Sequence, residues 1–162
     1  MDGLLRRPAP LLAPIALASF GAVGLALVSQ YRFDMLPCPW CTLQRLIFLI
    51  IGAFALLGLV LPSNGTRRVL AVGGVIFAVA GMASAFWQHF VAAKSDSCNL
   101  TLADRILQSL GLFDVAPSVF APQASCADAA VNLLGVPYAF WSLALFLLLG
   151  VACVQVVRVA RI

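Results

Sequence analysis

The chain has 162 residues, of which 63% are hydrophobic and 10% are charged, and its mean hydropathy is +1.05. This composition excludes a soluble globular domain, in which about a quarter of the residues are charged. The formal net charge of +4 does not indicate a nucleic-acid-binding protein, because the basic residues are scattered and there is no glycine-rich phosphate-binding loop.

Four apolar runs cover about residues 10–29, 43–61, 69–91 and 136–157. Each is long enough, or nearly so, to cross the bilayer core as a helix, which takes about 20 residues. We therefore predict one all-α domain over residues 1–162, an integral membrane four-helix bundle. In the third run small residues recur at helical spacing, which predicts close packing against a neighbouring helix; they are Gly74, Ala78, Gly81 and Ala85.

Basic residues are divided unevenly between the two ends of the predicted bundle. One end holds Arg6, Arg7, Arg67, Arg68, Arg158 and Arg161, and the other holds Arg32, Arg45, Lys94 and Arg105. By the positive-inside rule, both termini and the turn of residues 62–68 are cytoplasmic. The turn of residues 30–37 and the long loop of residues 92–135 then face the outside, where conditions are oxidising and disulfides persist.

The second run is preceded by Cys38-Pro39-Trp40-Cys41 and continues through Gln44-Arg45. With Cys38 at the N-cap and Pro39 at the first helical position, Cys41 falls in the first turn of a helix. Arg45 follows one turn later on the same face. A helix N-terminus and a nearby cation both favour thiolate over thiol, so this spacing predicts a reactive cysteine.

The loop of residues 92–135 is too long for a structureless connection in a small bundle, which indicates a function. Thr101 and Asp104 form a candidate capping box, and the residues that follow have the apolar spacing of a short amphipathic helix on the membrane surface. Pro117 and Pro122 are expected to end any helix and leave the rest mobile.

Three interpretations compete for the cysteine pairs Cys38–Cys41 and Cys98–Cys126. Two structural disulfides are one, although a CxxC ring closes too short a loop to add much stability. A four-thiolate zinc site is another, but Cys98 and Cys126 do not form a second knuckle, so we expect no metal. The third is a thiol–disulfide relay between a mobile pair and a membrane-embedded pair. Cys153, inside the fourth run, is interpreted as a small buried apolar residue.

The order Pro-Cys-x-x-Cys-x-x-Gln-Arg, a later cysteine pair in one outer loop and four spans together resemble the DsbB family of bacterial disulfide-bond formation proteins. The resemblance implies that Cys98 forms a mixed disulfide with a periplasmic thioredoxin-like protein of the DsbA type. Cys126 would resolve that pair and exchange with Cys38. Cys41 would meet a membrane quinone as a thiolate, and Arg45 would hold the quinone.

The same resemblance implies a multi-pass protein of the inner membrane and a quinone cofactor, with ubiquinone favoured over menaquinone. The alternative interpretation of Arg45 is a snorkelling side chain, whose apolar stem lies in the membrane and whose charged group extends to the aqueous interface. Gln44 fits either a hydrogen bond to a quinone carbonyl or a polar cap on the bundle. His89 fits either a donor to a quinone oxygen or an interfacial side chain.

Two features leave other interpretations open. The Pro39-Trp40 interior of the CxxC is bulkier and stiffer than expected for much of the family. A vitamin K epoxide reductase-like enzyme is the alternative membrane thiol oxidoreductase, but there the loop cysteines precede the CxxC, and here they follow it. A membrane scaffold with a disulfide-stapled loop is the non-enzymatic alternative.

Overall fold

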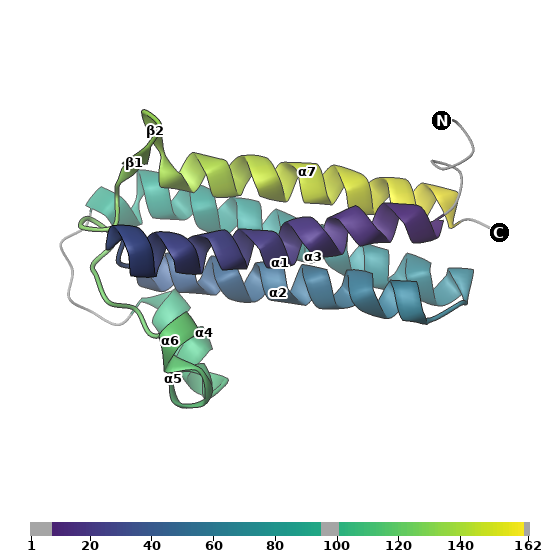
Figure 1. Ribbon diagram of the computed structural model, residues 1–162, viewed down its shortest axis with the longest axis horizontal. Helices are drawn as coiled ribbons and strands as arrows, with labels where there is room; N and C mark the ends of the chain where they lie inside the picture. The colour runs from purple at the N-terminus through teal and green to yellow at the C-terminus, as the bar shows by residue number, and fades with distance from the viewer. Residues whose placement is uncertain (1–7, 95–100, 161–162) are drawn as a thin grey trace.

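In the computed structural model, which describes residues 8–94 and 101–160, four long helices lie side by side (Figure 1). They are α1 (Pro8–Phe33), α2 (Pro39–Val60), α3 (Asn64–Phe90) and α7 (Tyr138–Val159). Each contains a segment long and apolar enough to cross a membrane. The predicted all-α membrane bundle is therefore confirmed.

The helix ends differ from the predicted ones because a helix can continue through polar residues, which a search for apolar runs does not detect. α1 continues to Phe33, past the polar residues that end the first apolar run, and α3 begins at Asn64 instead of residue 69. α7 begins at Tyr138, since Val136–Pro137 (β2) pairs with Asn132–Leu133 (β1) in a small antiparallel hairpin.

The predicted small-residue face of α3 is buried. At its centre, Phe146 of α7 is fully buried and lies against Gly81, and its ring stacks on Phe48 of α2 with centroids 4.0 Å apart. A Cβ atom at Gly81 would come within 2.5 Å of the Phe146 ring. Close approach at a glycine therefore joins α2, α3 and α7 at mid-depth.

α1 packs mainly against α2. The contact between α1 and α7 is much smaller than the contact between α3 and α7. The side of the bundle between α1 and α7 is consequently the least tightly closed. This matters for the site because the first turns of α2 lie behind the same opening.

Residues 101–137 form a set of short elements beside the end of the bundle where α2 begins (Figure 1). They are α4 (Leu102–Ser109), α5 (Leu112–Val115), α6 (Pro117–Phe120) and the hairpin, and the 3₁₀ turn η1 (Ala92–Lys94) follows α3. Thr101 and Asp104 form the predicted capping box of α4. α5 ends just before Pro117, as expected, but the chain after it is not irregular. Pro117 stands at the first position of α6, where its missing N–H costs nothing, and α6 packs on α2 through buried Phe120.

Candidate functional site

Cys38 and Cys41 lie at the N-terminus of α2 in the predicted arrangement. Cys38 is the N-cap and its sulfur accepts a hydrogen bond from the backbone N–H of Cys41 at 3.3 Å, with Pro39 in the first turn. The two sulfurs are 2.7 Å apart, and Cys38 is fully buried whereas Cys41 is partly exposed. Within this pair, Cys41 is therefore the cysteine open to a bound molecule.

Cys126 lies beside Cys38, and their thiols share a hydrogen bond. The hydrogen bond to Cys126, with a further one to Cys41 and with burial, raises the pKa of Cys38 well above its ordinary value. The same hydrogen bond from Cys38 lowers the pKa of Cys126. Cys126 is thus prepared to act as a thiolate next to a protonated Cys38. Cys98 lies outside the described residues.

The segment that carries Cys126 is held against the bundle by backbone contacts. The N–H groups of Gln123 and Ala124 both donate to the carbonyl of Pro37, at 2.9 and 3.3 Å. The Tyr31 hydroxyl at the end of α1 donates to the carbonyl of Ser118 at 2.9 Å. The stretch that was expected to be mobile is therefore anchored to the bundle within α6, at Ser118, and just after α6, at Gln123 and Ala124.

Arg45 is buried one turn below Cys41 and its guanidinium joins three segments. Its Nη1 donates to the side-chain oxygen of Gln30 at 2.8 Å and to the carbonyl of Val119 at 2.9 Å, and its Nη2 donates to the carbonyl of Ala26 at 3.4 Å. A charge buried in a membrane helix is tolerated when it is paired in this way. Arg45 thus links α1 and α2 to α6.

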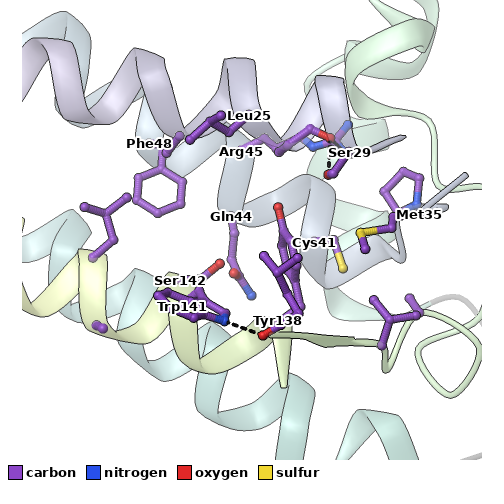
Figure 2. Close-up of a pocket in the computed structure, with 18 of the residues that line it drawn as sticks. Leu25, Ser29, Met35, Cys41, Gln44, Arg45, Phe48, Tyr138, Trp141 and Ser142 are labelled. Atoms are coloured by element: carbon purple, nitrogen blue, oxygen red, sulfur yellow. Dashed lines mark hydrogen bonds between the residues drawn. The ribbon is translucent and has the colours of Figure 1, made fainter. Parts of the chain in front are cut away.

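A cavity of about 440 Å³ opens between α1, α2 and α7, directly beside these groups (Figure 2). Most of its wall is apolar, and Cys41, Gln44 and Arg45 of α2 supply polar groups to it. The Tyr138 and Trp141 side chains line it from α7, where the Trp141 Nε1–H donates to the carbonyl of Leu133. The volume falls in the range of roughly 300–1,000 Å³ that is typical of small-molecule sites, and an apolar wall with few polar groups is their usual composition.

Gln44 meets a residue that sequence reasoning missed. The Gln44 Nε2 donates to the side-chain oxygen of Gln88 in α3 at 2.6 Å, and the Gln88 Nε2 in turn donates to Cys41 Sγ at 3.1 Å. Both glutamines are buried. The available signal was a polar residue in the last turn of a membrane helix, which usually has a functional or structural partner.

His89 lies apart from the larger cavity. Its ring packs against Phe90 and Phe140, with centroids 4.9 and 4.7 Å away. It lines a second, smaller cavity of about 70 Å³ that also touches Cys126 and Tyr138. His89 therefore shares a cavity with Cys126 and does not line the larger cavity beside Cys41.

The unusual interior of the CxxC has a packing role. Pro39 starts α2, and Trp40 is buried with its ring 6.4 Å from that of Trp87 in α3. The two indoles meet at a tilt of 43°, and their separation lies within the range of about 4.5–7 Å that is typical of aromatic pairs. The bulky dipeptide thus fastens the redox-motif turn to α3.

Comparison with known proteins agrees with this site. The family described as "Disulfide bond formation protein DsbB" matches residues 7–156. "Disulfide bond formation protein B" of Cupriavidus metallidurans is 33% identical over 136 residues, which cover 83% of each chain. That of Cupriavidus necator is 33% identical over 89% of each chain. "Disulfide bond formation protein B 1" of Pseudomonas syringae pv. syringae is 33% identical over 93% of this chain and 91% of its own. With both redox-type cysteines at the head of α2 and the match over almost its whole length, the chain belongs to the DsbB family of membrane disulfide-bond formation proteins.

Proposed function

We propose that this protein oxidises a periplasmic thioredoxin-like dithiol protein of the DsbA type and passes the electrons to a membrane quinone. In the net reaction the partner's dithiol becomes a disulfide, and two electrons and two protons reduce the quinone to the quinol. The cluster of Cys126, Cys38 and Cys41, in which Cys41 lines an apolar cavity, is the observation that carries the proposal.

The first half of the proposed relay runs through the loop pair. A thiolate of the partner attacks Cys98 of a Cys98–Cys126 disulfide, which forms a mixed disulfide and releases Cys126 as a thiolate. Cys126 then attacks Cys38, and the Cys38–Cys41 bond breaks with its electron pair left on Cys41. The position of Cys126 beside Cys38 supports this order, because it brings the attacking sulfur next to the sulfur that it attacks.

The second half restores the loop pair. The partner's other thiolate attacks its own mixed-disulfide sulfur, which releases Cys98 and completes the partner's disulfide. Cys98 then attacks Cys126 in the Cys38–Cys126 disulfide and releases Cys38. Cys38 and Cys41 are left as a dithiol, and their two electrons and two protons must leave through the cavity.

The cavity has the chemistry that a quinone headgroup requires. Its wall is apolar, Cys41 and Arg45 supply polar groups to it, and Tyr138 and Trp141 provide flat aromatic surfaces. A bound quinone supplies a two-electron acceptor, and we expect ubiquinone ahead of menaquinone. Arg45 would orient a carbonyl oxygen, and the sparsely closed side between α1 and α7 would admit an isoprenoid tail from the lipid.

We further propose that the cysteine end of the bundle faces the periplasm and that both termini are cytoplasmic in the bacterial inner membrane. Arg67 and Arg68 at the start of α3 and Arg158 in the last turn of α7 lie at the end opposite the cysteines. A basic end opposite an end with paired cysteines fits this orientation.

The direct test uses the purified protein in detergent with a reduced DsbA-type protein and soluble ubiquinone or menaquinone. Quinone reduction, followed by absorbance, should be lost in Cys41→Ser and retained in Cys153→Ser, the matched control for removal of a buried thiol. Quinone reduction that survives in Cys41→Ser would reject the relay. In Cys126→Ser, where Cys98 has no disulfide partner, mixing with the oxidised form of the partner should let Cys98 attack the partner's disulfide and form a mixed disulfide at Cys98.

A further inference from the structure

Within residues 8–94 and 101–160, which the structure describes, one side chain outside the CxxC turn donates a hydrogen bond to Cys41. That side chain is Gln88. Its Nε2 is 3.1 Å from Cys41 Sγ, and 5% of the residue is exposed. The guanidinium of Arg45 is engaged elsewhere, on Gln30, Val119 and Ala26. A thiolate at Cys41 therefore meets the neutral amide of Gln88 at short range.

The direction of this hydrogen bond is set by chemistry at both ends. A thiolate can only accept, so the NH₂ group of Gln88 must face Cys41 whenever the sulfur is ionised. The Gln88 oxygen then faces Gln44, whose Nε2 donates to it at 2.6 Å. Gln44 thus holds the amide in the orientation that presents N–H groups to the sulfur.

We propose that Gln88 is a catalytic hydrogen-bond donor to the Cys41 leaving thiolate and that Gln44 is the positioning residue that orients it. The inference rests on the proposed relay. When Cys126 attacks Cys38, the Cys126–Cys38 bond forms and the Cys38–Cys41 bond breaks. The electron pair goes to Cys41 Sγ, and the Gln88 N–H stabilises the resulting charge without adding a counter-charge to the apolar cavity.

This assignment differs from the role predicted for Gln44, which was a hydrogen bond to a quinone carbonyl. Because Gln44 lines the cavity through its side chain and also donates to Gln88, its loss should act on Cys41 through Gln88. The two glutamines should therefore behave as one unit in a double-mutant comparison.

The experiment measures the pH dependence of Cys41 alkylation by iodoacetamide in fully reduced Cys38→Ser protein, resolved by mass spectrometry of the labelled peptide. Neither partner nor quinone is present. In Gln88→Leu the pH midpoint of alkylation should rise by about one unit, which corresponds to about tenfold less thiolate below the midpoint. Gln88→Glu, which keeps the side-chain size, should raise it as well, since an ionised carboxylate cannot donate.

Gln44→Leu should raise the midpoint less than Gln88→Leu does, and the double variant should match Gln88→Leu alone. The matched control is Gln108→Leu on the exposed face of α4, which should leave the midpoint unchanged. An unchanged midpoint in both Gln88→Leu and Gln88→Glu would overturn the inference. Additive effects of the two leucine variants would overturn the positioning role of Gln44. If the variants shift the midpoint as expected but the wild-type protein does not reduce quinone, the proposed function alone is rejected.

Discussion

The link that Arg45 makes between the bundle and the loop can be broken by Arg45→Met, which removes the guanidinium and keeps a long apolar stem. The two shortest hydrogen bonds lost are those to Gln30 at 2.8 Å and to the Val119 carbonyl at 2.9 Å. A hydrogen bond to a charged group contributes about 1.5 kcal/mol or more. Only the bond to Val119 joins Arg45 to α6, because Gln30 belongs to α1. Its loss should change the equilibrium between docked and undocked α6 by about 1.5 kcal/mol, or roughly tenfold.

Hydrogen–deuterium exchange of the purified protein measures this equilibrium directly. The Gln123 amide is a suitable reporter, since it donates to the carbonyl of Pro37 at 2.9 Å when the loop is docked. In Arg45→Met, peptides that span residues 117–124 should exchange about tenfold faster than in the wild type. Arg105→Met, which removes a cation from the exposed face of α4, is the matched control and should exchange at the wild-type rate.

Wild-type exchange in Arg45→Met would refute the reasoning that the guanidinium fastens α6 to α2. The same variant also separates the two roles assigned to Arg45. Under the proposed function it should raise the apparent KM for quinone. Faster exchange with an unchanged KM would leave Arg45 as a structural link and remove it from the quinone site.

Three further outcomes are expected. Cys38→Ala should raise the pH midpoint for alkylation of Cys126 in reduced protein, because the hydrogen bond from Cys38 lowers the pKa of Cys126 and favours its thiolate. Gly81→Ala should destabilise the bundle by about 1–3 kcal/mol, since the new methyl group meets the buried Phe146 ring; unfolding in mixed detergent micelles measures this. Ala22→Phe narrows the cavity from α1 and should raise the KM for quinone about tenfold while partner exchange at the cysteines continues.

Each of these expectations has a control within the same chain. For Cys126, alkylation at neutral pH that is as slow in the wild type as in Cys38→Ala would contradict the stated direction. Gly21→Ala is the control for Gly81→Ala, and Gly21→Phe is the control for Ala22→Phe. Both suit this use because nothing lies within 4 Å of a Cβ atom at Gly21. Equal loss of stability in Gly21→Ala and Gly81→Ala would contradict the close-packing argument, and an equal rise of KM in Gly21→Phe and Ala22→Phe would contradict the location of the quinone site.

Local sequence patterns were sufficient for the features whose causes are local. Apolar run length located the four spans, because a helix must satisfy its own backbone in lipid. Cys38 as N-cap and the Thr101–Asp104 capping box followed from short spacings, since the capping groups lie within one turn of the backbone that they bond. The ends of α1 and α3 were less predictable because polar residues continue a helix without any apolar signal.

The parts of the site that depend on distant contacts were not predictable. Nothing in the spacing of residues 117–124 shows that this stretch folds back onto Pro37, or that Pro117, which follows the end of α5, also begins a new helix. Gln88 belongs to no motif, and its role emerges only when α3 brings it beside Cys41, 47 residues away in sequence. The sequence therefore predicted the local geometry of the CxxC turn better than the contacts around it.

The two hydrogen bonds on the Pro37 carbonyl also determine the kinetics of the loop. Cys126 follows the anchored Ala124 by two residues, and a chain spans at most about 3.6 Å per residue, so its backbone stays within about 7 Å of that anchor. Such a short tether keeps the Cys126 sulfur near Cys38 at an effective concentration of millimolar or higher. Under the proposed function, exchange between them is then a first-order step that dilution cannot slow, and only the encounter with the soluble dithiol protein depends on concentration.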